Sequence, residues 1–209
     1  MTNSEHTAQA CGQVGGQVGA QADKQAKIQA LRWLAKAYAD VPNAQCLSAF
    51  PRESFACLGA NPADSDAVAR AGETCLHNPD AARDLRVEFT GLFSGFQREC
   101  PFPYESVYTS AECLMQQEAM DAAIEAYQAA GFAFPGAYVE PADFISYQLD
   151  FVAFLLEQGN EEGARAWAAQ HLANWLPAFT QDVLDRSNEE YFAALAHLSL
   201  CVVYDSPLI

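Results

Sequence analysis

The residues with the clearest chemical potential are carboxylates and aromatic rings in two short segments, 100–108 (CPFPYESVY) and 140–147 (EPADFISY). The first segment contains Tyr104 and Glu105, and the second contains Asp143. A carboxylate can pair with a guanidinium group through two parallel hydrogen bonds, and rings in a proline-stiffened loop lose little entropy on binding. These residue types favour recognition of a cationic, partly apolar ligand.

Catalytic alternatives for the same residues have less support. Glu140 and Asp143 could form an acid–base pair, but acidic residues also favour the first turn of a helix. Cys100 could be a reactive thiol, but the neighbouring Glu99 carboxylate disfavours the thiolate. The four histidines form no HExxH motif, and we assign His171 to packing or capping. The sequence therefore predicts no catalytic residue, no metal site and no cofactor.

The charge of the chain narrows the class of partner. The formal net charge is −16, from 27 acidic and 11 basic residues. Phosphate binding needs Lys and Arg, so nucleic acid is not an expected partner, whereas a basic partner is favoured. Between Arg98 and Arg165 there is no Lys or Arg, although acids run from Glu99 to Glu162. Solvated helix faces usually mix charges, so this interval predicts a cationic ligand.

Cysteine usage and hydropathy point to the compartment. The seven cysteines are odd in number, irregularly spaced and without a CxxC pair, which favours reduced thiols in the cytoplasm. No apolar run approaches the roughly 20 residues that a spanning helix needs. The N-terminus lacks the basic and apolar regions of a signal peptide, so stable membrane insertion is not expected.

A helix over residues 139–159 is the element expected to position the acidic and aromatic side chains. Pro141 suits its first turn and Gly159 its end. Apolar residues cover most of this helix, which is typical of the centre of a bundle. The remaining face carries Tyr147 among the carboxylates Glu140, Asp143, Asp150 and Glu157.

Apolar spacing and cap residues predict helices along the rest of the chain and no strands, although LCVVY at 200–204 could also be a strand. The expected features are a first helix from Lys24 to near Pro42, a second over 44–58, N-caps at Asn61, Asn78 and Asn160, capping boxes at Thr109/Glu112 and Ser187/Glu190, and a stop or kink at Pro177. We expect an all-α, single-domain helical bundle over residues 25–209. The Gly- and Gln-rich residues 1–24 are expected to form a disordered tail.

Several blocks of the sequence resemble, in the same order, the blocks of the TorD/DmsD family of redox-enzyme maturation chaperones. They are VEFTGLFSG (87–95), PYESVY (103–108), AYQAAGF (126–132), EPADFISYQLDFVAFLL (140–156) and HLANWLPAF (171–179). The resemblance covers roughly residues 25–205 and implies a TorD-like helical bundle, either monomeric or a domain-swapped dimer. It also implies a cytoplasmic chaperone that is not an enzyme.

The resemblance implies binding of the twin-arginine signal peptide, the apo-protein, or both, of a molybdopterin oxidoreductase catalytic subunit, which delays export until the cofactor is inserted. Carried over by position, the peptide-binding residues are Leu92, Phe93, Pro103, Tyr104, Glu105, Glu140, Asp143 and Phe144, and the helix face adds Tyr147. Phe144 departs from the family, which usually has His there, so any role of that imidazole is lost.

Two alternatives stay open at this point. A NarJ-like assembly chaperone of the same fold would bind the apo-enzyme without its signal peptide. An enzyme using Cys100 or the Glu140/Asp143 pair would be a different class of protein. Nucleotide binding has no Walker motif to support it.

Overall fold

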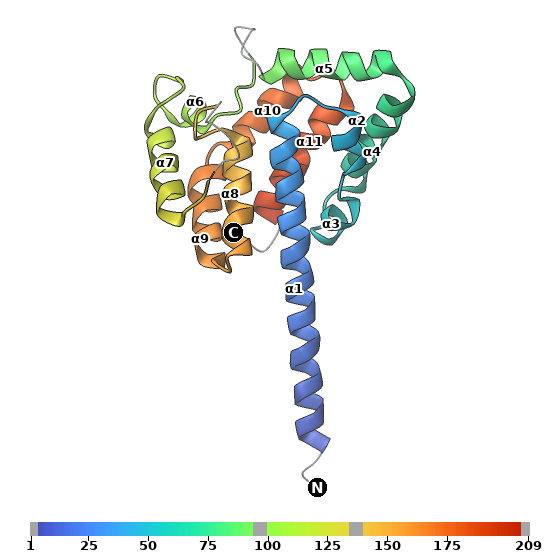
Figure 1. Ribbon diagram of the computed structural model, residues 1–209, viewed down its shortest axis with the longest axis vertical. Helices are drawn as coiled ribbons and strands as arrows, with labels where there is room; N and C mark the ends of the chain where they lie inside the picture. Colours follow the sequence, from blue (N-terminus) through green and yellow to red (C-terminus); the bar gives the residue numbers. More distant parts are fainter. Residues whose placement is uncertain (1–3, 94–99, 134–139, 206–209) are drawn as a thin grey trace.

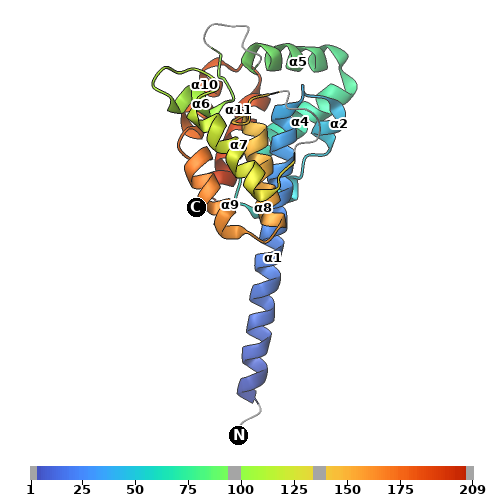
Figure 2. The same cartoon turned by 60° about the vertical axis from the view of Figure 1, so that its left-hand side comes forward.

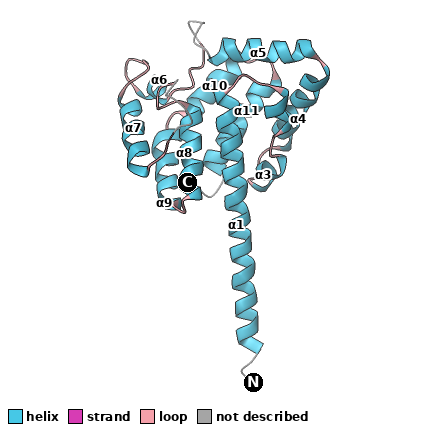
Figure 3. Ribbon diagram, viewed as in Figure 1, coloured by secondary structure: helices cyan, strands magenta, loops and turns pink. Residues whose placement is uncertain are grey.

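The structure is a computed structural model that describes residues 4–93, 100–133 and 140–205, with side chains described for residues 21–204 of these ranges. Within them every regular element is a helix, and extended pairing is limited to one isolated bridge between Tyr104 and Phe144. Figure 3 shows the described chain as helices and connecting loops. The prediction of an all-α fold is confirmed.

The helices are, in chain order, α1 (Ser4–Ala39), α2 (Ala44–Ser48), α3 (Arg52–Cys57), α4 (Pro62–His77), α5 (Pro79–Phe93), α6 (Glu105–Thr109), α7 (Glu118–Ala130), α8 (Ile145–Glu157), α9 (Glu161–Trp167), the π-helical turn η1 (Ala168–Leu172), α10 (Leu176–Arg186), α11 (Glu190–Leu200) and the π-helical turn η2 (Cys201–Asp205).

Three contacts between helices form the centre of the bundle. The second half of α1 packs along α8, and α11 packs against both α4 and α10. α2 to α4 lie on one side of this centre, α6, α7 and α9 lie on the other, and α5 crosses the top in the view of Figure 1. The first half of α1 extends from the body without a neighbouring helix (Figures 1 and 2). The disorder predicted for residues 1–24 stays a prediction.

The core is rich in aromatic rings that meet edge to face. Around α8, the centre of the Phe151 ring lies 4.7 Å from the ring centre of Tyr127 and 4.9 Å from that of Trp167. Burying a large apolar side chain contributes about 1.5–3 kcal/mol, and offset or edge-on ring pairs add about 0.5–1.5 kcal/mol. α8 is therefore held on several sides at once, as its nearly all-round apolar composition predicts.

The asparagine start signals are confirmed. The Asn61 side chain accepts from the Ala63 N–H at 3.1 Å, and the Asn78 side chain accepts from the Asp80 N–H at 3.0 Å. Asn160 accepts from the Gly163 N–H at 2.9 Å at the start of α9. An N-cap acceptor depends only on local sequence, which is why these starts could be predicted.

Both predicted capping boxes are wrong. Thr109 is the last residue of α6, its hydroxyl donates to the Glu105 carbonyl at 3.0 Å, and α7 begins only at Glu118. Ser187 ends α10 instead of starting α11. The N–H groups of Asn188 and Glu189, just before α11, donate to the Glu88 carboxylate of α5 at 2.5 and 3.2 Å. An acceptor from another helix thus takes the place of the local one.

Two other boundaries differ from expectation. The helix predicted over 44–58 is two helices, α2 and α3, separated at Pro51. After α9 the chain changes to the π-helical turn η1 before it reaches Pro177, which lies in the first turn of α10. The helical interpretation of LCVVY is confirmed, since Leu200 ends α11 and the residues that follow form η2. Within the described residues no helix combines the length and the apolar composition that crossing a membrane requires.

Candidate functional site

The two segments singled out by their residue types lie against each other. The Ile145 N–H donates to the Pro103 carbonyl at 2.9 Å, and the Glu105 N–H donates to the Asp143 carbonyl at 3.2 Å. This pairing holds Phe144 in an extended conformation, with φ −63° and ψ 134°. The prediction that the central helix begins near Pro141 is therefore wrong. α8 starts at Ile145 because the preceding residues pair with the 103–105 segment instead of coiling.

Asp143 caps a helix other than its own. One carboxylate oxygen accepts from the Ser106 N–H at 2.8 Å and from the Ser106 hydroxyl at 2.5 Å, in the first turn of α6. Asp143 is fully buried, and its other oxygen, Oδ1, has no hydrogen-bond partner. Leaving a buried acceptor unpaired costs about 1–3 kcal/mol. Asp143 thus joins the two segments and keeps an unused acceptor at their junction.

Glu105 lies at the centre of a buried polar network. Its Oε2 accepts from Gln148 Nε2 at 2.6 Å and contacts His171 Nδ1 at 3.2 Å, while Oε1 accepts from Asn174 Nδ2 at 3.4 Å. His171 stacks on the Trp167 ring at 4.0 Å between ring centres. No Lys or Arg pairs with Glu105 among the described residues. The carboxylate is positioned by donors that do not cancel its charge unless the imidazole is protonated.

Aromatic rings cover the outer side of the same junction. The Tyr104 hydroxyl donates to Glu140 Oε2 at 2.6 Å, and its ring lies 5.3 Å from Phe144. Phe144 in turn meets Tyr147 edge to face at 5.5 Å. Burial, together with the hydrogen bond to Glu140, raises the pKa of Tyr104. Tyr104 therefore stays a neutral donor throughout the physiological pH range.

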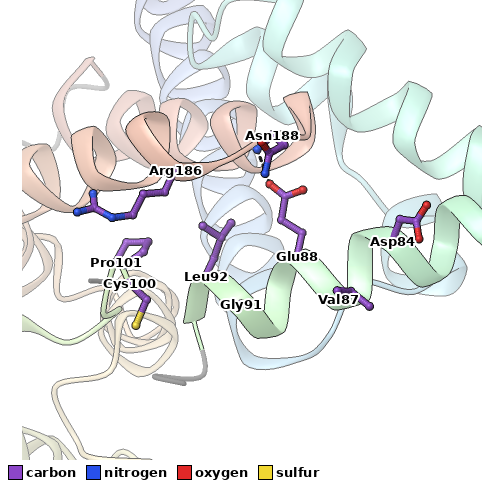
Figure 4. A pocket seen from close by; sticks show the side chains of 9 residues that line it. All are labelled: Asp84, Val87, Glu88, Gly91, Leu92, Cys100, Pro101, Arg186 and Asn188. Atoms are coloured by element: carbon purple, nitrogen blue, oxygen red, sulfur yellow. Dashed lines mark hydrogen bonds between the residues drawn. The ribbon is translucent and has the colours of Figure 1, made fainter. Parts of the chain in front are cut away.

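Leu92 and Phe93 lie at a different place. Phe93 packs into the core between Tyr38, at 5.8 Å, and Phe192, at 6.0 Å. Leu92 lines a cavity of about 660 Å³ between α5, the residues that follow Cys100, and the α10–α11 turn. In Figure 4, Leu92 and Glu88 of α5 face Arg186 and Asn188 across this cavity. The structure thus brings seven of the nine predicted residues together, and their role in peptide binding stays a prediction.

A second cavity, of about 520 Å³, opens beside Glu105. We call it the acidic hollow, and it is lined by Glu105, Thr109, Ser110, Ala111, Glu112, Gln117, Glu118, Ala119, Ala122 and His171. Three of these residues are glutamates, and the exposed Asp121 and Glu125 continue the negative charge along α7. Arg98 and Glu99 of the predicted one-sign interval lie outside the described residues. The acidic hollow is a concave surface suited to a cationic group.

The other carboxylates of α8 have an internal partner. Arg32 of α1 donates to both Asp150 and Glu157, with the Glu157 Oε2 contact at 2.7 Å. Burial alone would lower the pKa of Arg32, but the hydrogen bonds to Glu157 and Asp150 outweigh it and raise the pKa. The carboxylates predicted to share one face of the central helix are therefore divided between two surroundings.

The sequence reasoning missed the donors that position the carboxylates. Ser106 and Gln148 were not singled out, and His171 was assigned to packing or capping although it also lines the acidic hollow. A usable signal was present: His171, Asn174 and Trp175 recur at the three- and four-residue spacing of one helix face. A polar pair beside a Trp on such a face is a common form of buried network.

The side chains of this arrangement are suited to hydrogen bonding and to charge pairing. Among the described residues, no group of three or more His, Cys, Asp or Glu side chains could hold a metal ion. The described cysteines carry free thiols, and Cys100 is buried. What the junction offers a ligand is a hollow with carboxylates on its rim and a neighbouring set of rings, of which Tyr147 is partly exposed.

Comparisons with known proteins agree with this reading. A family model described as nitrate reductase delta subunit matches residues 61–181. The chain is 29% identical to the chaperone protein TorD of Photobacterium profundum, over 64% of this chain and 67% of that protein. It is 28% identical to TorD of Escherichia coli O45:K1, over 82% and 89%. The match to TorD of Vibrio cholerae (strain O395) is 30% identical and spans 61% of that relative.

One solved structure shares the fold. It comes from Archaeoglobus fulgidus and is described as a candidate redox enzyme maturation protein. The TM-score is 0.51 at 21% sequence identity, and the alignment covers 84% of this chain and 90% of the other. At that identity the likeness establishes the helical fold and nothing further.

Proposed function

This chain belongs to the TorD family of redox-enzyme maturation chaperones, and from that premise we propose that it binds the twin-arginine signal peptide of a molybdopterin oxidoreductase precursor in the cytoplasm. Binding would delay export of the precursor until its cofactor is in place. The relatives are named as chaperones, which is a non-enzymatic role and agrees with the prediction that the chain is not an enzyme.

The observation that carries the proposal is the unbalanced charge at the acidic hollow. Glu105, Glu112 and Glu118 line it, and no Lys or Arg belongs to its lining. A twin-arginine leader begins with guanidinium groups, which can pair with carboxylates through two hydrogen bonds each. A body of apolar, helix-forming residues follows, and helix-in-groove recognition would place these residues against exposed apolar side chains.

The burial of the predicted residues limits their roles. Tyr104, Glu105, Asp143 and Phe144 are all buried, so they shape the junction more than they present surface. The half-buried Glu140 and Tyr147 and the open rim at Glu112 and Glu118 are the parts that a leader reaches first. We therefore assign first contact to the rim and positioning to the buried residues.

Leader binding by calorimetry is the direct test. We expect synthetic twin-arginine leaders of the molybdopterin oxidoreductases of the same genome to bind, with affinity that falls as salt concentration rises. The variant Glu112→Lys/Glu118→Lys should bind at least about tenfold more weakly at low salt, equivalent to about 1.4 kcal/mol. The matched control is Glu73→Lys/Glu162→Lys, which makes the same change of net charge at exposed residues outside the hollow.

Affinity for the precursor, measured with and without its leader, separates this proposal from the alternative. If removing the leader leaves affinity unchanged, the chain acts as a NarJ-like assembly chaperone on the apo-enzyme. If both charge-reversal pairs weaken binding equally, net charge and not the acidic hollow attracts the ligand. The predicted choice between a monomer and a domain-swapped dimer can be read from the sedimentation of the same samples.

A further inference from the structure

The loop between α6 and α7, Ser110–Gln117, has a fixed conformation. The Leu114 N–H donates to the Ser110 hydroxyl at 3.2 Å, and the Gln117 N–H donates to the Ser106 hydroxyl at 3.3 Å. The Gln117 side chain also donates to the Met115 carbonyl at 3.1 Å. Since the Ser106 hydroxyl itself donates to Asp143, the end of the loop is tied to the buried junction.

This fixed loop holds two large apolar side chains in solvent. Leu114 is 52% exposed and Met115 is 36% exposed. The residues on either side, Cys113 and Gln116, have positive φ angles of 52° and 61°, a conformation that residues with a side chain rarely adopt. A backbone held in an unfavourable conformation to expose apolar side chains is typical of a binding surface.

The charge beside these two side chains indicates what covers them. Glu112 precedes them and Glu118 follows them in the chain, and both glutamates line the acidic hollow. The loop itself contains no Lys or Arg. An anionic partner would be repelled by the two glutamates, and a purely apolar partner would cover them without pairing their charge. A segment with cationic residues next to apolar ones fits both parts of the surface.

We propose that Leu114 and Met115 form the docking platform for the apolar segment that follows the arginine pair of the leader, while the arginine pair occupies the acidic hollow. This inference rests on the proposed function and adds the residues that contact the apolar segment of the leader. Because the loop is already ordered, little conformational entropy is lost when the ligand binds. The platform thereby selects leaders by the hydropathy of the residues beside the arginines.

The test compares two leader peptides on two proteins. One peptide is the native twin-arginine leader, and the other keeps the arginines but has serines in place of the adjacent apolar residues. We expect the native protein to prefer the first peptide by at least about tenfold, and Leu114→Ser/Met115→Ser to lose most of this preference. The decrease in affinity with added salt should be the same for both proteins, because the acidic hollow is unchanged.

The control variant is Val41→Ser/Leu76→Ser, which removes two exposed apolar side chains outside the loop, 39% and 58% exposed, and should keep the full preference. If Leu114→Ser/Met115→Ser lowers the midpoint temperature of thermal unfolding, the single variant Leu114→Gln provides the same comparison in a folded protein.

The outcomes separate the two proposals. Failure of the native protein to bind either peptide would overturn the proposed function. Binding of the native leader with the tenfold preference intact in the folded loop variants would overturn the platform alone. A change in sedimentation of the loop variant, without a change in leader preference, would make the patch a contact between copies of this chain and would also overturn the platform.

Discussion

Two groups of carboxylates on or beside α8 look alike in the sequence and differ in the structure. Asp150 and Glu157, along the helix, both accept hydrogen bonds from Arg32 of α1. Asp143 and Glu105, at its N-terminal end, accept from Ser106, Gln148, His171 and Asn174. One guanidinium group serves both carboxylates of the first group, whereas no Lys or Arg among the described residues pairs with the second group beside the acidic hollow.

Acidic residues alone therefore do not identify a binding surface. A carboxylate that already pairs with a guanidinium group gains little from a second cation, whereas one held by neutral donors still attracts it. Arg32 therefore marks the carboxylates that stabilise the α1–α8 contact, whereas Asp143 and Glu105 position the junction beside the acidic hollow. Substitutions on the two sides should differ in size, in salt dependence and in what they impair.

The largest effect is expected at the buried junction. Asp143→Ala removes the acceptor for both the N–H and the hydroxyl of Ser106, and we expect a loss of about 2–4 kcal/mol in the free energy of unfolding. Asp143→Asn keeps one acceptor oxygen and should lose less. Urea unfolding followed by circular dichroism measures both. A loss under about 0.5 kcal/mol for the alanine variant would mean that Asp143 does not join the two segments.

Lys27 on α1 provides the counterpart of Arg32, because it is buried and pairs with no carboxylate among the described residues. The pKa of Lys27 is lowered from 10.5 to about 8, chiefly by burial and to a smaller extent by Arg165, against an opposing influence of Cys201. The buried charge of Lys27 destabilises the folded state by its full amount below pH 8. This destabilisation is lost as the pH rises to 10.5, because Lys27 loses its proton first in the folded state and then in the unfolded state. Lys27→Met should therefore stabilise the protein by up to about 3 kcal/mol at pH 7, from about 1.4 kcal/mol per pKa unit.

The decisive measurement is the free energy of unfolding of Lys27→Met and of the unmodified chain as a function of pH. The stability of the unmodified chain should rise relative to Lys27→Met between pH 8 and 10.5, and the two should converge above that range. A stabilisation that is independent of pH would show that Lys27→Met acts through packing and not through the buried charge.

The smallest effect is expected at the carboxylates that pair with Arg32. Arg32→Met leaves Asp150 and Glu157 facing each other without a cation, but more than a third of the Arg32 side chain is in solvent. Screening limits the loss to about 1 kcal/mol, and the loss should shrink in high salt. Leader affinity should not change. Adding Asp150→Asn and Glu157→Gln should recover part of the stability, and a large loss of leader binding would contradict the separation of the two carboxylate groups.

Much of the fold could be predicted because its signals are local. Asn61, Asn78 and Asn160 each cap the helix that directly follows, and apolar spacing identified α1 and α8. The two boundaries with a failed capping box fail for a shared reason. Glu88 of α5 accepts from the residues before α11, and the Ser106 hydroxyl of α6 accepts from the N–H of Gln117, just before α7. Such acceptors lie on another helix and leave no pattern near the helix they serve.

By itself the sequence determined the all-helical class, the apolar central helix and the excess of negative charge, since each depends on residue type and on spacing along one chain. Only the tertiary structure decided which carboxylates meet Arg32 and which meet neutral donors. It also decided that Leu92 and Phe93 lie apart from the Tyr104–Phe144 junction. The reason is that the effect of a charge depends on the groups within a few ångströms of it, and folding brings those neighbours from segments that are 37 to 125 residues apart for these carboxylates.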